Sequence, residues 1–326
     1  MKFDKSVIQI AAAAAIAATA ALPATSFAQA YPNKPVKIIV PFAPGGTTDT
    51  MSRLSGASLS KTLNQPFVIE NRPGGFTLIG TDVVAKAAPD GYTLGVQANS
   101  MATEQVLNKD WTLRIDRDIA VISTFAGAGY SVSVSMESGI KSLKDLVSVM
   151  KANPGKYNQG QAGSISPDMA VLLNRLGVPP IENILYKGGA LATQALTANE
   201  VQLYGASTID VASLHKSGKV RVIAYTDKER DGLLPEIPTV AESGVGLNDF
   251  EAGYWFAMFG QGALPADIVG RLNTAMLGLT KDPEFVAKAT TFGMRVYSLN
   301  AAESRARVLS SVRLIEQAVA AGIKLR

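Results

Sequence analysis

The sequence predicts an α/β fold that is built from parallel β-sheets and divided into two lobes. Short apolar runs alternate with helix-like stretches from Val36 to the C-terminal region, and this alternation is typical of repeated βαβ units. The chain has 326 residues, of which 47% are hydrophobic and 18% are charged, so it can bury a full core. Its composition changes gently near residues 125–129 and again over residues 226–246, as expected where a chain crosses into a second lobe and returns.

The first 30 residues are typical of a cleaved signal peptide. Met1–Lys5 carries two lysines, residues 8–22 are apolar and rich in alanine, and Ala28-Gln29-Ala30 is a small-x-small cleavage site. A membrane anchor needs about 20 apolar residues, and this run is shorter and poor in large aliphatic side chains. We therefore expect residues 1–30 to be removed and the mature, exported chain to begin at Tyr31.

The strands are predicted from the apolar runs in chain order. Each run is short and is bounded by turn residues, as strands in α/β proteins are. The predicted strands are Val36–Val40, Pro66–Glu70, Thr93–Val96, Val121–Thr124, Ser131–Ser135, Gln159–Ala162, Asn183–Tyr186, Val201–Gly205, Val220–Tyr225 and Tyr254–Phe259.

The helices are predicted in the longer segments between these strands and in the C-terminal region. Turn sequences such as Ala88-Pro89-Asp90-Gly91 and Asn153-Pro154-Gly155 mark where helices end. The predicted helices are Thr50–Asn64, Leu78–Ala87, Ser142–Ala152, Pro167–Leu176, Ala190–Ala198, Ile209–Lys216, Pro265–Thr280, Glu284–Thr290 and Ala302–Ala321.

Two soft boundaries divide the mature chain into lobes. We expect residues 31–126 together with residues 228–326 to form lobe 1, and residues 127–227 to form lobe 2. The two crossovers, near Phe125–Gly129 and Thr226–Asp227, would act as a hinge. Two lobes joined in this way would hold a cleft between them.

The composition excludes several kinds of chemistry. There is no cysteine, which rules out disulfides, thiol nucleophiles, zinc–cysteine sites and a lipid anchor at an N-terminal cysteine. The formal net charge is +4, and removing Lys2, Lys5 and Asp4 leaves 29 basic and 26 acidic side chains, a net +3. These charges are scattered, without a basic stripe or an aromatic platform, so we expect no nucleic-acid partner.

Catalytic groups are also hard to find. The single histidine, His215, lies at the polar end of a predicted helix, where its positive form would suit the helix dipole. A catalytic triad would have to use it, and no G-x-S-x-G elbow is present. Asp116 and Asp118 are expected in a solvated connector, and Asp168 is the only general base that an enzyme could offer. We expect no cofactor and no metal, although a calcium site made of carboxylates alone stays open.

The loop after the first strand has the character of an anion site. A strand, a turn rich in proline and glycine and then a helix N-terminus leave several backbone N–H donors without intrahelical partners. Glycine lets a ligand approach the backbone closely. The alternative is an ordinary turn in which Asp49 or Thr48 caps the helix, and for Asp49 the cap is the preferred interpretation. The candidate ligand residues here are Phe42, Ala43, Gly45, Gly46, Thr47, Thr48 and Asp49.

Three later strand-to-helix loops repeat this pattern. The first places hydroxyls and a glycine before Pro167, the second adds a cation and a ring, and the third supplies two hydroxyls. Ligands in open α/β sheets bind outside the carboxyl ends of strands, so four such loops in an exported chain favour a solute-binding protein. The residues concerned are Gly163, Ser164, Ile165 and Ser166, then Tyr186, Lys187 and Gly188, then Ser207 and Thr208.

An ordered set of motifs resembles one family over essentially the whole mature chain. The set opens with Tyr31-Pro32-x-Lys34-Pro35-Val36 and Ile39-Val40-Pro41-Phe42-x-Pro44-Gly45-Gly46-x-x-Asp49. It continues through Glu70–Gly74, Ala88–Leu94, Ala152–Lys156, Tyr186–Gly189, Ser217–Arg221 and Pro238–Gly244. This pattern is similar to the substrate-binding proteins of tripartite tricarboxylate transporters, the Bug family.

The resemblance implies a type II periplasmic binding-protein fold: two α/β lobes, two crossovers and one ligand in the cleft. It implies a monomeric receptor in the periplasm that binds a small carboxylate and serves inner-membrane transporter subunits of the tripartite type. On this resemblance, the loop from Phe42 to Asp49 and the loop from Gly163 to Ser166 would together hold one carboxylate, while Tyr186, Lys187 and Gly188 match a third family motif.

Departures from the family pattern bear on specificity. Phe76 stands where alanine and glycine are usual, and the segment Asn99-Ser100-Met101 replaces a common Thr-His pair. The loop around Ile165 is shorter than usual and lacks a histidine, and Gln202 replaces a frequent aspartate. If Phe42, Phe76, Met101 and Ile165 all face the cleft, it is apolar, which favours an aromatic or long-chain dicarboxylate such as terephthalate. The alternative places Phe76 and Met101 in the core of the lobe.

Two other functions stay open on the sequence. The same lobes could serve a sensor for a citrate-like or amino-acid carboxylate, because transport and signalling would both use the outer face of the closed lobes. A periplasmic enzyme on the same fold would need a general base in the cleft, and Asp168 is the residue available for it.

Overall fold

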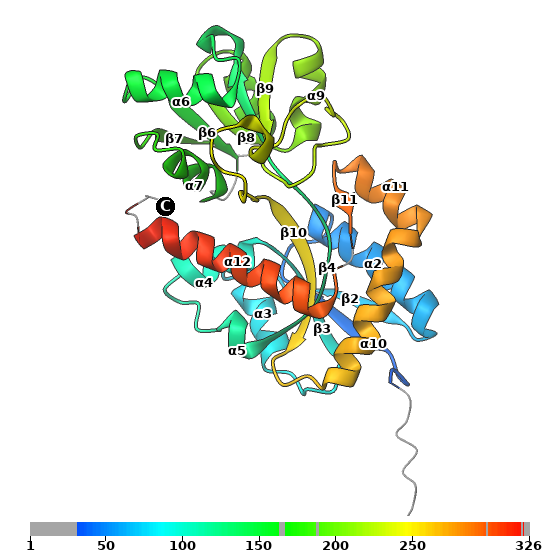
Figure 1. Ribbon diagram of the computed structural model, residues 1–326. Helices are drawn as coiled ribbons and strands as arrows, with labels where there is room; N and C mark the ends of the chain where they lie inside the picture. Colours follow the sequence, from blue (N-terminus) through cyan, green and yellow to red (C-terminus); the bar gives the residue numbers. More distant parts are fainter. Residues whose placement is uncertain (1–30, 163–166, 187–188, 298, 321, 323–326) are drawn as a thin grey trace, which may run out of the picture. The chain divides into compact units, whose positions relative to one another are not determined.

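The computed structural model describes residues 31–162, 167–186, 189–297, 299–320 and 322 (Figure 1). Two β-sheets lie within one compact unit, residues 34–326. Among the described residues, no helix combines the length and the apolar character needed to cross a bilayer.

The first sheet has six strands in the order β11-β4-β10-β3-β1-β2. β1 pairs in parallel with β2 and β3, whereas β10 runs antiparallel to both β3 and β4. The expectation of purely parallel sheets is therefore wrong, because the strand that returns from the other lobe enters the sheet in the opposite direction. The strands are β1 (Val36–Val40), β2 (Phe67–Asn71), β3 (Thr93–Ala98), β4 (Ile119–Ala128), β10 (Tyr254–Gln261) and β11 (Arg295–Val296).

The second sheet has five strands in the order β7-β6-β8-β5-β9. β6 pairs in parallel with β7 and β8, and β5 runs antiparallel to β8 and β9. Its three parallel strands correspond in order to β2, β1 and β3 of the first sheet. The strands are β5 (Ser131–Ser135), β6 (Asn158–Ala162), β7 (Glu182–Tyr186), β8 (Leu203–Ala206) and β9 (Val220–Tyr225).

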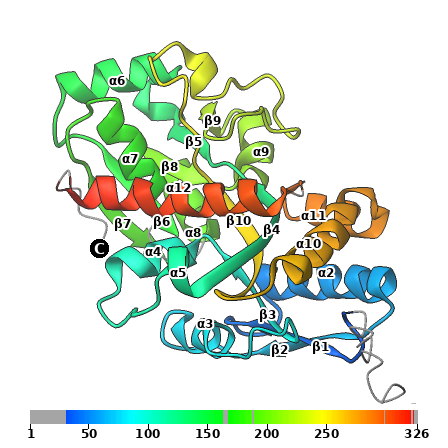
Figure 2. The same cartoon turned by 60° about the horizontal axis from the view of Figure 1, so that its bottom comes forward.

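Helices cover both sheets (Figures 1 and 2). In lobe 1 they are α2 (Thr47–Leu63), α3 (Leu78–Ala85), α4 (Ser100–Leu107), α5 (Ile115–Asp118), α10 (Ala266–Leu277), α11 (Pro283–Thr291) and α12 (Ala301–Ala320). In lobe 2 they are α6 (Leu143–Ala152), α7 (Pro167–Arg175), α8 (Gly189–Thr197) and α9 (Thr208–Lys216). Short 3-10 turns lie at Met136–Ser138, Ala241–Ser243 and Gly278–Lys281.

One hydrophobic cluster extends through both lobes. It includes Met101 of α4 and Val312 of α12 as well as Leu146 of α6 and Leu172 of α7. Figure 2 shows α12 lying beside α4 and α7, which is how the cluster passes from one sheet to the other. A second cluster, with Leu196 and Val211 among its members, fills the space between the second sheet, α8 and α9.

Two connections join the sheets. β4 ends at Ala128 in the first sheet and β5 begins at Ser131 in the second. After β9, however, residues 228–250 pack on lobe 2: Tyr225 N–H donates to Pro238 O at 2.9 Å, and Leu234 and Ile237 join the lobe 2 core. The chain returns to the first sheet only at Tyr254, so the second connection extends over residues 226–253.

Candidate ligand-binding site

The loop after β1 presents a helix N-terminus to solvent. Ala43, Pro44, Gly45 and Gly46 are exposed, and Thr50 N–H makes the first intrahelical bond, to Gly46 O at 2.9 Å. Helix geometry therefore leaves the N–H groups of Thr47 and Thr48 directed out of the helix end, where a carboxylate oxygen can accept them. The loop therefore has the backbone geometry that the sequence predicted, and its contact with a ligand stays a prediction.

Asp49 holds this loop in shape and does not cap the helix in the expected way. The N-cap is Gly46, which has no side chain to offer. The Asp49 carboxylate is buried and accepts Gly45 N–H at 2.9 Å, Arg53 Nε at 3.0 Å and Asn71 Nδ2 at 2.9 Å. Burial raises the pKa of Asp49, but those hydrogen bonds and the Arg53 charge outweigh it and leave the pKa below its usual value. Asp49 and the buried Thr48 thus support the loop from beneath.

Asn71, at the end of β2, fixes the first loop to the second strand. Its Nδ2 donates to Phe42 O at 3.1 Å as well as to Asp49, and Arg53 Nη2 donates to its Oδ1 at 3.0 Å. No role for Asn71 was predicted, although it stands inside the motif Glu70–Gly74. Its position at a strand end next to a predicted ligand loop is the signal that could have identified it.

Phe76 projects from a loop with an unusual backbone. Its side chain is 71% exposed, so the alternative that placed it in the lobe core is wrong. Gly74, Gly75, Phe76 and Thr77 all have positive φ, and for the β-branched Thr77, at φ 76°, this is a genuine outlier. Gln97 Nε2 donates to Thr77 Oγ1 at 2.9 Å and holds that residue in place. Gly80, one turn further on, packs against Pro41, so the Phe76 loop adjoins the loop after β1.

Ser100 and Met101 have different surroundings in the folded chain. Met101 is completely buried in the hydrophobic core, so its assignment to the cleft surface is wrong and the core alternative is correct. Ser100 Oγ is buried without a hydrogen-bond partner at the start of α4. Its neighbour Asn99 bonds to Trp255 O through its N–H, at 3.2 Å, which fixes this turn beside the incoming strand β10.

In lobe 2, only part of the predicted set is described. Gly163, Ser164, Ile165, Ser166, Lys187 and Gly188 lie outside the described residues. Thr208 is 2% exposed and its Oγ1 shares a hydrogen bond with Ser131 Oγ at 2.8 Å. It therefore supports its loop, and ligand contact by its hydroxyl stays a prediction. Tyr186 is half-buried, with its ring over β6, 3.6 Å from the position of a Cβ at Gly160.

Tyr254, the first residue of β10, brings the loops of the two lobes together. Its side chain is hydrogen-bonded to Ser207 of lobe 2, and burial raises its pKa. Its ring lies 5.8 Å from that of Tyr130, in the first crossover. Neither tyrosine was predicted, because each gains its role only when the crossovers are assembled. Ser207 of lobe 2 and the turn at Asn99 of lobe 1 therefore contact neighbouring residues of β10, Tyr254 and Trp255.

The enzyme alternative gains no support from the described residues. Asp168 is buried, and the described residues that line its cavity, Arg175 and Arg307 among them, include none of the predicted ligand residues. His215 lies in the last turn of α9, as predicted, and its Nδ1 accepts Val222 N–H at 3.1 Å, which gives it a structural role. No group of three or more potential metal ligands is found in the part of the chain that the structure describes.

Comparison with known proteins identifies the family. Residues 51–317 match the family described as "Tripartite tricarboxylate transporter family receptor". The chain belongs to this receptor family. The resemblance drawn from the sequence motifs is confirmed, and so is the expectation of a receptor, since the family is one of binding proteins.

Solved relatives of this receptor family share the fold. The periplasmic binding protein BugD is 30% identical, with a TM-score of 0.65 over 90% of this chain and 99% of its own. An R. palustris protein solved with adipate is 27% identical, with a TM-score of 0.68 over 90% and 98%. MatC from Rhodopseudomonas palustris, solved with malate, is 28% identical, with a TM-score of 0.64 over 87% and 98%. The predicted periplasmic binding-protein fold is confirmed.

Proposed function

We propose that this receptor captures an aromatic or long-chain dicarboxylate, terephthalate being one example, in the periplasm and delivers it to inner-membrane subunits of a tripartite transporter. The family supports a carboxylate receptor, and two relatives were solved with the dicarboxylates adipate and malate. The signal-peptide pattern of residues 1–30 supports export. The finer choice of ligand depends on the apolar surface beside the carboxylate-binding loop.

Phe76 is the observation that carries this choice. Its ring is 71% exposed, and four consecutive residues with positive φ hold it next to the loop after β1. Strained backbone of this kind persists where surrounding structure enforces it and is concentrated at functional sites. A ring held in solvent gains free energy when a ligand covers it, about 25 cal/mol for each Å² of apolar surface removed from water. A ligand with an apolar body between its carboxylates uses that surface, whereas citrate does not.

Calorimetric titration of the mature chain tests the proposal. The panel is adipate, terephthalate, malate and citrate, each measured with wild type and with Phe76→Ala. We expect adipate or terephthalate to bind tightest, and Phe76→Ala to weaken that binding by roughly tenfold or more while changing malate binding little. Val68→Ala is the matched control, because Val68 is 53% exposed on edge strand β2 and lies outside the predicted ligand loops.

Two results would contradict the choice of ligand. Tightest binding of citrate would keep the receptor and reject the apolar ligand. An unchanged affinity of Phe76→Ala for every bound acid would remove Phe76 from the site.

A further inference from the structure

The two crossovers lie against each other and are joined by hydrogen bonds of the backbone and of the Thr226 side chain. Thr226 Oγ1 accepts Tyr130 N–H at 2.7 Å and donates to Ala252 O at 2.8 Å. Gly129 lies so close that a Cβ there would come within 2.7 Å of Asp227 N. These contacts make one junction from three segments: 128–130, 225–227 and 252–254. Any change in lobe arrangement has to pass through this junction.

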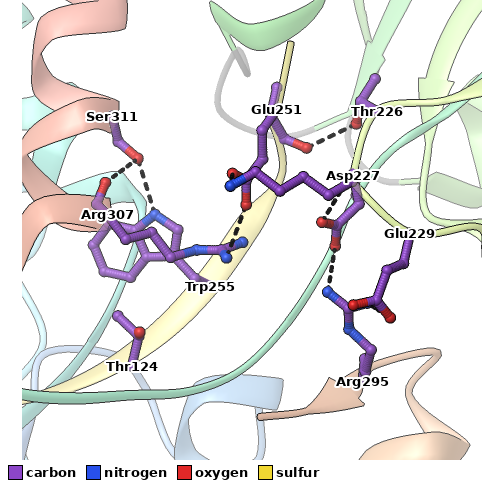
Figure 3. A network of polar contacts seen from close by, with 12 residues as sticks. Thr124, Thr226, Asp227, Glu229, Glu251, Trp255, Arg295, Arg307 and Ser311 are labelled. Atoms are coloured by element: carbon purple, nitrogen blue, oxygen red, sulfur yellow. Dashed lines mark hydrogen bonds and ion pairs between the residues drawn. The ribbon is translucent and has the colours of Figure 1, made fainter. Parts of the chain in front are cut away.

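Two arginines of lobe 1 form ion pairs with acidic residues of the segment 226–253, which connects the second sheet back to the first (Figure 3). Arg295, on β11, pairs with Asp227 at 3.4 Å and with Glu229. Arg307, on α12, pairs with Glu251 at 2.9 Å, and Lys228 Nζ lies 2.9 Å from the same carboxylate. We call Arg295, Arg307, Asp227 and Glu251 the hinge brace.

Three of the four side chains of the hinge brace have little exposure to solvent. The side chains of Asp227 and Arg307 are 3% and 17% exposed, and that of Glu251 is 25% exposed. Glu229 and Lys228 are largely exposed, so their pairings contribute little. Charges this poorly solvated depend on their partners, because separating them leaves an uncompensated charge.

A tyrosine fixes the two arginines relative to each other. The guanidinium of Arg307 lies 4.9 Å from the centre of the Tyr297 ring, and that of Arg295 lies 5.8 Å from it. Both distances suit cation–π attraction. The Tyr297 hydroxyl is buried at Gly127 of β4, so both cations are anchored to the first sheet.

The segment that the brace holds is itself attached to lobe 2. Leu234 and Ile237 pack in the lobe 2 core, and Asp249 pairs with Arg175 of α7 at 2.8 Å. Cavities of about 560 and 770 Å³ flank the Asp227–Arg295 pair, and both are lined by these two residues. The Asp227–Arg295 pair of the brace therefore borders open space.

We propose that the hinge brace is an ionic latch that sets the balance between lobe arrangements, and so controls ligand affinity through positioning residues that never touch the ligand. A ligand binds with an apparent affinity that scales with the fraction of protein in the competent arrangement. Charges that favour one arrangement change that fraction. The latch extends the receptor function proposed above, and its first test needs no ligand.

The test compares three variants with wild type. Arg295→Met and Arg307→Met each remove one tie, and Arg230→Met is the matched control. Arg230 pairs with Glu242 at 2.8 Å, and both residues lie within the segment 226–253, so that pair does not join the lobes. We expect the two brace variants, and not the control, to change the small-angle scattering radius of unliganded protein and to speed amide exchange at residues 128–130 by about tenfold or more.

A charge swap separates a latch from a simple loss of stability. Glu251→Arg and Arg307→Glu should each alter the scattering radius, and the double variant should move it back toward wild type. Arg307→Gln, which also removes the charge, replaces Arg307→Met if that variant does not fold. With adipate as the probe, the affinity should shift by about tenfold in the same variants.

Identical scattering and exchange in the brace variants and in Arg230→Met would overturn the latch. If adipate fails to bind wild type, the ligand choice is wrong, but the ligand-free scattering still decides whether the latch exists.

Discussion

Single residues at the candidate site divide into those proposed to contact the ligand and those that hold the loop. Backbone N–H groups of the loop after β1 were predictable, because proline, glycine and a helix start are read directly from neighbouring residues. Asn71 was not, since its bond to Asp49 joins positions 22 apart along the chain. Met101 was misplaced for the same reason: it is buried in a cluster that includes residues of helix α12, which begins 200 residues downstream.

Asp49→Asn tests the supporting role at residue scale. Asparagine keeps the shape but loses the charge that faces Arg53, so the free energy of unfolding at pH 7 should fall by about 1–3 kcal/mol. The pKa of Asp49 is lowered in the folded chain, so this stabilisation is present above the unfolded value near 3.8 and is lost as pH falls further. Urea unfolding at pH 7 and pH 3 should show the difference shrinking in acid.

Asp82→Asn is the control for that measurement. Asp82 forms an exposed pair with Lys86 at 2.7 Å, four residues along α3, and such pairs contribute at most about 0.5 kcal/mol. An equal loss in both variants would show that Asp49 has no special role in the loop.

At the scale of elements, the sequence predicted the strands well because each is a short apolar run between turn residues. β1, β5 and β9 have the predicted bounds. α4 was missed, because Ser100–Leu107 is too short to show a helical period and its buried residues are selected by packing on α12. β11 has two residues and leaves no sequence pattern at all.

Two glycines in regular elements should respond to alanine in opposite directions. At Gly205 of β8, a Cβ would overlap Met169 in the first turn of α7, so Gly205→Ala should destabilise the protein by about 1–3 kcal/mol and displace that turn. Gly270 of α10 is exposed with open space around it, so Gly270→Ala should stabilise by about 0.5–1 kcal/mol. Thermal unfolding of both variants checks the signs, and a stable Gly205→Ala would mean that α7 is not closely packed on β8.

At the scale of the whole molecule, the sequence showed two lobes and two crossovers but not where the second crossover ends. Residues 228–250 are rich in proline, glycine and charge, which is the composition of a linker. Their few apolar side chains, Leu234 and Ile237 among them, nevertheless pack on lobe 2. The lobe to which a segment belongs is decided by a handful of long-range contacts, which local composition does not reveal.

Gly253→Ala tests whether close packing of the crossovers governs the molecule as a whole. A Cβ at Gly253 would overlap Ala128 O and lie 2.9 Å from Gly129 Cα, so it would press on the backbone of the other crossover. The overlap can be relieved only if the backbone of one crossover moves. We therefore expect the free energy of unfolding to fall by about 1–3 kcal/mol and the scattering radius of the unliganded chain to change. Gly232→Ala, in the same connecting segment but in open space, should change neither quantity. If Gly253→Ala matches Gly232→Ala in both measurements, the lobes tolerate separation of the crossovers, and their arrangement depends on the side-chain brace and on α12 instead.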